Sequence, residues 1–340
     1  MRTFIFMILA AAYLLLTGCD VHQWPERDQI GEAELVIRLN FHPVMTVWEH
    51  YYDIDTKELT EAAVVTPESY DNTQHEGFIR YIVRIYPRSD TRSAIDTPLQ
   101  EYLFTSELDG QEYDFETTAT LPWGEYTVMA WADIRETYDE APRYDASDFA
   151  QVVLLDHTLN TDYRDAFCGT MDVTVDKTSS SEPVAQTVQV EMRRPQAKFQ
   201  IIAEGVEDFI QNAATRNDLS DYKVILAYTG YTPFAYSVLT DLLVDSRYNE
   251  RFESAITALD SSSISLAVDY FLVRADETST RVQIGVFDAA GQEIAMTDPF
   301  LVPLLRDRHT IIRGKFLAAH ASGGFVGIDP GFDGDINIVQ

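Results

Sequence analysis

The sequence predicts a mostly β protein with two antiparallel β-sandwich domains in tandem. Three observations support this fold class. Apolar and polar residues alternate with a period of two in segments of both halves of the chain, as in strands that bury one face. Only two short segments have helical spacing, and Pro195 separates two strand-like runs. Alternating, half-buried strands are typical of antiparallel sandwiches, whereas parallel sheets are built from strands that are apolar on both faces.

The chain begins with a segment typical of an export signal. A single basic residue, Arg2, precedes the uncharged apolar run Phe4–Leu16, which is shorter than the roughly 20 residues of a membrane-spanning helix. The run ends in the sequence LTGC at Cys19, which resembles the cleavage site of a bacterial lipoprotein signal. The resemblance implies that residues 1–18 are removed and that the Cys19 thiol takes a lipid. A plain secretory signal with an unrelated cysteine is the alternative.

Lipid on Cys19 has two consequences. Two or more acyl chains, such as palmitate, anchor a protein stably, and the polar residues 19–32 are then predicted to form a tether. Cys168, the second of two cysteines, is left without a partner, so we expect no disulfide and no thiolate zinc site. We predict that Cys168 is a small buried residue rather than a catalytic thiol.

In the first half, alternation predicts strands at AELVIRLNFH, FIRYIVRIYP and GEYTVMAWADI. In the second of these, Arg80 and Arg84 fall on the face opposite the apolar residues. Two acidic segments, YYDIDTKELTEAAVVTPESYDNTQHEG and DIRETYDEAPRYDASDF, predict long loops, which are usually functional or disordered.

In the second half, SISLAVDYFLVR predicts a strand, and TRVQIGVFDAAGQEIAM predicts a hairpin with its turn at residues 288–291. EDFIQNAATRN and YNERFESAITAL are the two candidates for short helices. HTIIRGKFLA carries Arg313 and Lys315 on one face. It is either an exposed edge strand that could pair with a partner's strand or an ordinary internal strand.

Pro195 marks the predicted domain boundary, because a central strand does not tolerate proline. The prediction is an N-terminal domain over residues 33–194 and a C-terminal domain over residues 195–340.

The composition excludes some partners. The chain has 340 residues, 25 of them basic and 55 acidic, and its formal net charge is −30. Such a surface repels nucleic acid and anionic lipid headgroups. Common catalytic and cofactor motifs (HExxH, GxSxG, the phosphate-binding loop and the dinucleotide fingerprint) are absent, and the seven histidines are scattered singly. We therefore interpret the histidines as surface residues and predict no enzyme, no cofactor and no metal.

The sequence contains two further candidate binding sites, one for calcium and one for a sugar. The tail DPGFDGDINIVQ places Asp329, Asp333 and Gly334 at positions 1, 5 and 6 of an EF-hand loop, but Gly331 and Gln340 stand at positions 3 and 12, where ligands belong. This predicts a turn rather than a calcium site. Among the tryptophans, Trp123 and Trp131 are attributed to turn or core packing, which leaves Trp24 and Trp48 freer to stack on a sugar.

Several segments resemble the fimbrillin-related surface lipoproteins of Bacteroides-type bacteria, which include fimbrial anchor (minor fimbrium) subunits. They include CDVHQWPE, GFIRYIVRIYP, LPWGEYTVMAWADI, DYRDAFCGT, EMRRPQAKFQII and VPLLRDRHTIIRGKFL. The resemblance implies two transthyretin-like sandwich domains, a lipid at Cys19 and a non-enzymatic role. Polymerising members are processed at an arginine, which frees a groove for a partner's strand, whereas an anchor keeps its first strand. Arg27 and Arg38 are available here, but neither is a clear processing site, which favours an anchor-like or a stand-alone lipoprotein over a polymerising subunit.

The resulting prediction is a lipid-anchored structural or adhesion protein of the outer membrane that grips fimbrillin-like subunits at the cell surface. A glycan-binding lipoprotein of a carbohydrate-uptake system is the alternative, and a lipid-anchored hydrolase comes third. Asp20, next to Cys19, retains lipoproteins at the inner membrane in some bacteria, so the side of the membrane is left open.

Overall fold

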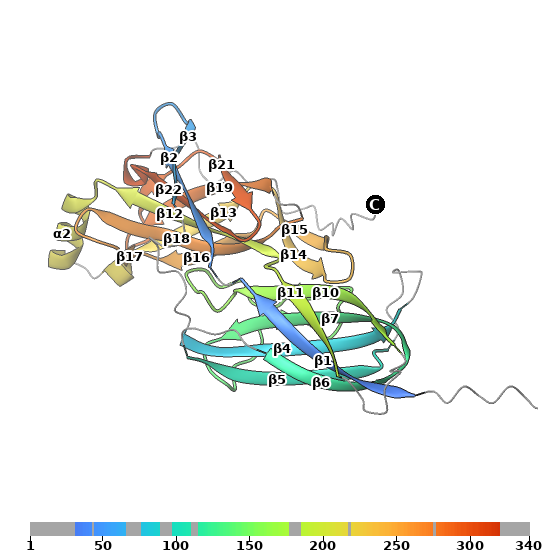
Figure 1. The fold of residues 1–340 in the computed structure, drawn as a ribbon. Coiled ribbons are helices and arrows are strands. Elements are labelled where there is room, and N and C mark those ends of the chain that lie inside the picture. The colour runs from blue at the N-terminus through green and yellow to red at the C-terminus, as the bar shows by residue number, and fades with distance from the viewer. Residues whose placement is uncertain are drawn as a thin grey trace, which may run out of the picture.

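The computed structural model describes residues 31–319, apart from residue 43 and residues 66–75, 89–96, 110–114, 177–184, 217–218 and 275–276. The protein is mostly β, as predicted. Figure 1 shows two stacks of strands, one holding β1 and the other holding β22. These are referred to below as the N-terminal and the C-terminal sandwich.

The N-terminal sandwich packs a three-stranded sheet on a four-stranded one. The first has the order β11-β1-β6 and the second the order β10-β7-β4-β5. Alternate residues of both sheets, Leu35, Ile37, Val83 and Ile85 among them, meet in one buried core, which confirms the predicted alternation. The strands are β1 (Glu32–Phe41), β4 (Glu76–Pro87), β5 (Gln100–Asp109), β6 (Phe115–Pro122), β7 (Gly124–Arg135), β10 (Ala166–Val175) and β11 (Gln186–Met192).

The C-terminal sandwich packs a six-stranded sheet on a five-stranded one. The larger sheet has the order β17-β18-β12-β22-β2-β3, and the smaller has the order β16-β13-β19-β20, with β21 also paired to β19. The strands of the larger sheet are β2 (Thr46–Tyr52), β3 (Leu59–Val65), β12 (Gln196–Glu204), β17 (Thr257–Ala258), β18 (Ser263–Leu272) and β22 (Arg308–Gly314). Those of the smaller are β13 (Lys223–Tyr228), β16 (Arg251–Ala255), β19 (Glu277–Phe287), β20 (Glu293–Met296) and β21 (Phe300–Leu305).

The predicted hairpin is confirmed, because β19 pairs antiparallel with β20 around a turn at residues 288–291. One of the two candidate helices forms, as α2 (Glu207–Arg216), followed by the short 3-10 helix η2 (Leu219–Asp221). A second one, η3 (Phe316–Ala318), follows β22. The other candidate, YNERFESAITAL, is wrong, because it contains strands β16 and β17. Phe252 and Ile256 both contact the core, and a spacing of four residues fits a strand as well as a helix.

Residues 51–65 are not a loop, contrary to the prediction for this acidic segment. They form the end of β2, a tight turn and β3. The Asp53 carboxylate closes the turn by accepting hydrogen bonds from the backbone N–H groups of Asp55 and Thr56, at 2.9 Å each. Lys57 then takes a positive φ of 60°. The rest of the acidic segment, residues 66–75, lies outside the described residues.

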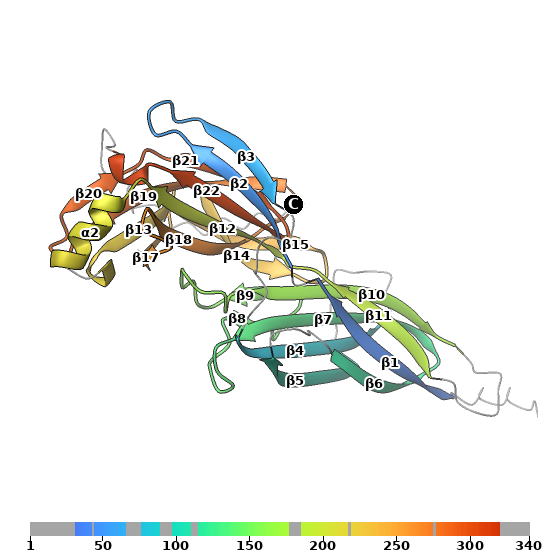
Figure 2. The same ribbon diagram turned by 60° about the vertical axis from the view of Figure 1, so that its left-hand side comes forward.

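The β2–β3 hairpin belongs to the C-terminal sandwich by its pairing, although it falls within residues 33–194. β2 runs parallel to β22, from Thr46 opposite Arg308 to Tyr52 opposite Gly314. Tyr52 stacks on Phe300 with ring centroids 4.6 Å apart. The chain therefore enters the C-terminal sandwich, returns to build β4–β11, and enters it again after Pro195 (Figures 1 and 2).

The edge-strand interpretation of HTIIRGKFLA is wrong. Its strand, β22, lies between β12 and β2 and pairs in parallel with both. Ile311 and Ile312 are both fully buried, so both faces of β22 are covered. An incoming strand would have no free edge to join.

The outer face of strands β4 and β7 is also covered. Arg80 and Arg84, predicted on the face opposite the apolar residues of their strand, are each only 8% exposed. Arg80 Nε donates to Asp133 Oδ1 at 3.0 Å, and Arg84 lies over the Phe149 ring with Cζ 4.4 Å from the centroid. The segment that follows β7 folds back over this face. The two arginines are therefore buried although their side chains are charged.

Candidate functional site at the domain junction

The two sandwiches meet at a third sheet. It has the order β15-β14-β9-β8, and Figure 2 shows β8 and β9 beside the N-terminal sandwich and β14 and β15 above it. A buried apolar cluster accompanies it, with Trp131, Phe149 and Tyr236 among its members. The two halves of the chain therefore share a core. The strands are β8 (Tyr144–Asp145), β9 (Val152–Leu154), β14 (Tyr231–Ser237) and β15 (Leu242–Tyr248).

Arg194 fixes the crossover from β11 to β12. Its Nε donates to both carboxylate oxygens of Asp165, at 2.8 and 3.1 Å, and Nη1 donates to Asp307 Oδ1 at 2.6 Å and to the His42 carbonyl at 3.0 Å. The guanidinium also lies over Phe167, with Cζ 4.5 Å from the ring centroid. A charge this deeply buried is tolerated because two carboxylates and a carbonyl accept hydrogen bonds from the Arg194 guanidinium. It joins parts of the chain that lie far apart in sequence.

A second buried network centres on Asp269 of β18. Its carboxylate accepts hydrogen bonds from Arg164 and from the Tyr228 hydroxyl, and lies 2.8 Å from His157 Nε2. Burial alone would raise the pKa of Asp269, but Arg164 and His157 outweigh it and hold the pKa at about 2. The Arg164 guanidinium also donates to the Tyr270 carbonyl at 2.7 Å. Residues 157–164, which precede β10, are thereby attached to the C-terminal sandwich.

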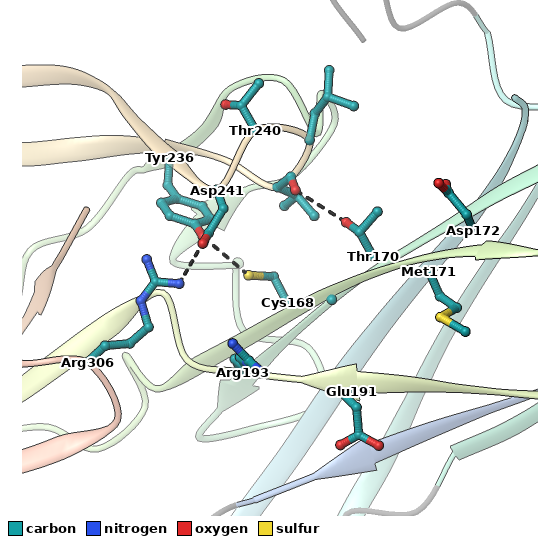
Figure 3. Close-up of a pocket in the computed structure, with 13 residues that line it drawn as sticks. Cys168, Thr170, Met171, Asp172, Glu191, Arg193, Tyr236, Thr240, Asp241 and Arg306 are labelled. Carbon is teal, nitrogen blue, oxygen red and sulfur yellow. Dashed lines mark hydrogen bonds and ion pairs between the residues drawn. The ribbon is translucent and has the colours of Figure 1, made fainter. Parts of the chain in front are cut away.

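A cavity of about 400 Å³ opens at the junction (Figure 3). Strands β10 and β11 form one wall, and the end of β14 with the following turn and Arg306 forms the other. Gly169 lets the two N-terminal strands approach closely, because a Cβ there would lie 2.5 Å from the Glu191 carbonyl oxygen. Beside it, Cys168 and Arg193 exchange backbone hydrogen bonds of 2.8 Å.

The Cys168 thiol lies in this cavity wall as a small buried residue, which confirms the sequence prediction. Its Sγ is 3.9 Å from the Tyr236 hydroxyl, which donates to Asp241. Arg306 Nη1 donates to the same carboxylate at 2.6 Å, as Figure 3 shows. Burial raises the pKa of the Cys168 thiol to about 12. The thiolate is therefore negligible at neutral pH, and the group is a poor nucleophile.

The open part of the cavity carries polar groups of both charges. Asp172, Glu191 and Arg193 line it together with Thr170 and Thr240. The Arg306 Nε is buried without a hydrogen-bond partner among the described residues. Such a set offers hydrogen bonds to a small polar group, so binding is the chemistry that it supports.

The structure corrects the interpretation as surface residues for three histidines, while His22, His75 and His320 lie outside the described residues. His50 and His309 are buried and His157 is largely so, whereas His42 is exposed. Burial lowers the pKa of His309 well below its usual value, and the Lys198 ammonium lowers it further. His50, His157 and His309 are core components, and burial lowers the pKa of each of them.

The other sequence-predicted candidates fall in different places. Cys19, Trp24 and the tail with Asp329 and Asp333 lie outside the described residues. Trp131 is fully buried and Trp123 packs partly buried against the N-terminal core, as expected for core and turn residues. Trp48 is half-buried, with Arg308 5.8 Å above its ring, so it is no open platform for a sugar.

Within the described ranges, no group of three or more His, Cys, Asp or Glu side chains is placed to hold a metal ion. In the same residues, no helix is both long and apolar enough to cross a membrane.

Sequence inspection missed Arg164, Arg194 and Asp269. A signal for one of them is present: Asp269 is the single charge in the apolar run SISLAVDYFLV. A lone charge inside such a strand has to be paired when buried. Which arginine pairs with it depends on the fold.

A model of a family of unknown function (DUF6562) matches residues 32–340. No curated protein matches the sequence.

Several solved structures have a similar fold. One is a DUF1812 protein from Bacteroides thetaiotaomicron for which polysaccharide binding has been suggested (15% identity, TM-score 0.41, covering 77% of this chain and 80% of that one). Another is the fimbrial anchor protein Mfa2 from Porphyromonas gingivalis (12%, 0.39, 78% and 82%). A third is the C-terminally truncated tip fimbrial protein Mfa3 from the same organism (14%, 0.41, 83% and 94%). Two of these three structures are fimbrial proteins, which is the kind of protein that the sequence resembles.

Proposed function

The chain belongs to the family of unknown function DUF6562, and we propose that it is a lipid-anchored structural or adhesion protein of the cell surface, of the fimbrial-anchor kind. The observation that carries this proposal is the signal-like segment ending at Cys19, only a short polar stretch before the folded strand β1. A lipid at Cys19 would hold the N-terminal sandwich close to the outer membrane. Fimbrillin-like subunits are the proposed partners.

An anchor has to keep its first strand, and β1 is built into the middle of its sheet. β1 is the central strand of its sheet, parallel to β11 and antiparallel to β6. Arg38 lies in the middle of it, with Nε 2.5 Å from Glu116 Oε2. Cleavage at Arg38 would separate the buried Leu35 and Ile37 from the chain. Retaining β1 keeps both the core and the covalent link to the lipid.

The route of β1 supports outward display of the C-terminal sandwich. β1 starts at the end of the N-terminal sandwich that is remote from the C-terminal one, as both views show (Figures 1 and 2). At the other end of β1 the chain passes directly into β2. With the tether at one end and a shared core at the junction, the C-terminal sandwich would point away from the membrane.

Surface display can be tested with an epitope tag in the exposed β19–β20 turn at Gly291. Gly291 has a φ of 76° and open space around its Cα, so an insertion there should leave the fold intact. We expect antibody to stain intact cells. The control is a tag on a periplasmic protein, which should stain only after permeabilisation. Staining that also requires permeabilisation would contradict surface display.

Glycan binding is kept as a second candidate because of one exposed aromatic pair. Tyr231 on β14 and Tyr248 on β15 lie opposite each other, 47% and 43% exposed, with ring centroids 5.1 Å apart. Exposed rings on a paired hairpin can stack on sugar faces. This platform replaces the tryptophans considered from the sequence.

If the tyrosine pair binds glycans, Tyr248→Ala should abolish retardation of the protein in gels containing soluble polysaccharides. Removal of a stacking ring typically costs about 1–3 kcal/mol in comparable aromatic contacts, or about fivefold to 150-fold in affinity. Tyr138→Ala is the matched control, since Tyr138 is exposed elsewhere in the molecule. Unretarded wild-type protein on every polysaccharide would leave adhesion to protein as the supported function.

A further inference from the structure

Strand β5 is a long and regular sheet edge. It spans ten residues, Gln100–Asp109, and lies last in the order β10-β7-β4-β5. Its ladder with β4 runs from Ile85–Gln100 to Glu76–Asp109 without a register shift. Figure 1 shows it at the outer side of the N-terminal sandwich. Such an edge presents unpaired N–H and C=O groups in a form that another strand can join.

Several other sheet edges in the described part of the chain are short, irregular or capped by side chains. The Thr118 and Thr120 carbonyls of β6 accept hydrogen bonds from the Tyr102 hydroxyl and Gln100 Nε2, at 3.2 and 2.9 Å. The pairings of β3 and β15 each contain register shifts, and β8 and β17 are two residues long. Proteins normally blunt their edges with bulges, short strands, proline or charged side chains, lysine above all. The sequence of β5, QEYLFTSELD, contains no proline and no lysine, and its charges are the carboxylates of Glu101, Glu107 and Asp109.

Both faces of β5 expose apolar side chains at one point. Leu103 is 67% exposed and pairs with Ile82, whose side chain belongs to the junction core outside the sandwich. Phe104 is 54% exposed and pairs with Tyr81, which belongs to the core inside the sandwich. A strand added at this edge would cover both side chains at once.

A shallow cavity of about 220 Å³ accompanies the edge on the Leu103 side. Leu103 and Leu155, which is 60% exposed, are among its lining residues. In strand addition, main-chain hydrogen bonds give affinity, and pockets for alternate side chains give selectivity. This cavity lies where such a pocket would be needed, and it is large enough for one apolar side chain of the added strand.

The charge of this surface favours a basic strand. Glu101 and Glu107 share the outer face of β5 with Leu103, because alternate residues of a strand point the same way. The whole chain carries a net charge of −30. Glu101 already pairs with Arg84 Nε at 2.5 Å, so a partner strand with arginine or lysine on this face would gain from Glu107 and from the net charge.

We propose that the free edge of β5 binds an extended strand of a partner protein, with basic and apolar residues on the face beside Leu103 and apolar residues over Phe104. The inference rests on the proposed adhesion function and gives it a place of contact. Because β5 belongs to the N-terminal sandwich, this contact is separate from the junction cavity and from the tyrosine pair.

The test uses a peptide that already fits one edge of β5. A fluorescent copy of residues 77–87, GFIRYIVRIYP, reproduces the strand that pairs with β5 and places arginine opposite Glu101. We expect it to bind the mature chain saturably in fluorescence anisotropy. Replacing both of its arginines by glutamate should weaken binding at least about tenfold.

The protein variant is Leu103→Lys, which puts a charge on the edge. It should weaken peptide binding at least about tenfold without changing the melting temperature, since Leu103 is largely exposed. Leu301→Lys, at an exposed leucine of β21 that is 50% exposed, is the control and should bind as the wild type does. Binding that is absent, or equal in Leu103→Lys and wild type, would overturn the proposal. A dimer of the chain that Leu103→Lys dissolves would also overturn it, because the occupant would then be a second copy. The tag experiment tests surface display separately, so a failure of peptide binding can be told apart from a failure of the proposed surface location.

Discussion

Asp269→Ala is expected to lower the free energy of unfolding by about 3–5 kcal/mol. Asp269 is fully buried and compensates Arg164, which is itself only 1% exposed. Removing one partner of a buried pair leaves an uncompensated charge in a medium of low polarity, which costs this much. Urea denaturation followed by tryptophan fluorescence measures the loss.

Glu253→Ala is the matched control, because Glu253 forms an exposed ion pair with Lys223 (3.3 Å) and such pairs contribute about 0–1 kcal/mol. The pH dependence gives a second check. Since the folded pKa of Asp269 is about 2 and its ordinary value is 3.8, its contribution is complete above pH 3.8 and disappears as the pH falls through about 2. The stability difference between wild type and Asp269→Ala should therefore narrow in that window. An equal loss in Asp269→Ala and Glu253→Ala would contradict the structural role of the network.

Cys19→Ala is expected to abolish membrane anchoring. Without the thiol there is no site for the lipid, and the remaining chain should be found unprocessed or shed instead of in the outer-membrane fraction. Cells fed labelled palmitate, followed by fractionation, give both readouts in one experiment. A lipid of two or more acyl chains holds a protein stably in a bilayer, so the effect should be close to all-or-none.

Cys168→Ala provides the control for thiol chemistry. Cys168 is buried in the cavity wall, so its variant should keep the label and the membrane location. Label retained in Cys19→Ala and lost in Cys168→Ala would reverse the assignment. Absence of label from the wild type would favour the plain secretory signal.

The shared core and the two buried charge networks make the junction part of the function that we propose. Arg194 binds Asp165 and Asp307, and Arg164 binds Asp269. A surface protein that holds a partner has to transmit load from the partner to the tether. A junction with its own sheet and its own core resists bending better than a linker between independent domains, so the orientation of the C-terminal sandwich is built into the fold.

The sequence alone determined the fold class and the strands with clear alternation. Leu35, Ile37 and the hairpin of β19 and β20 could be predicted because side chains of a strand alternate between two faces. Pro195 could be placed between two strands because proline cannot donate a hydrogen bond to a sheet. Cys168 could be assigned to the interior because its neighbours in the sequence are apolar and it has no partner cysteine. The lipid site at Cys19 is likewise a local pattern of residues, and it stays a prediction.

Only the tertiary structure decided which strands are neighbours. The parallel pairing of β2 and β22 joins residues 46–52 to residues 308–314, and no local pattern encodes a partner so distant. For the same reason the sequence leaves open whether β22 is an edge strand or an internal one, and it places buried histidines such as His309 on the surface. Alternation specifies that a strand has two faces, whereas the exposure of each face depends on which other segment packs against it. The position of β5 at a sheet edge also depends on the tertiary structure. A strand is an edge only when no other strand pairs with its second side, and among the described strands only β4 pairs with β5.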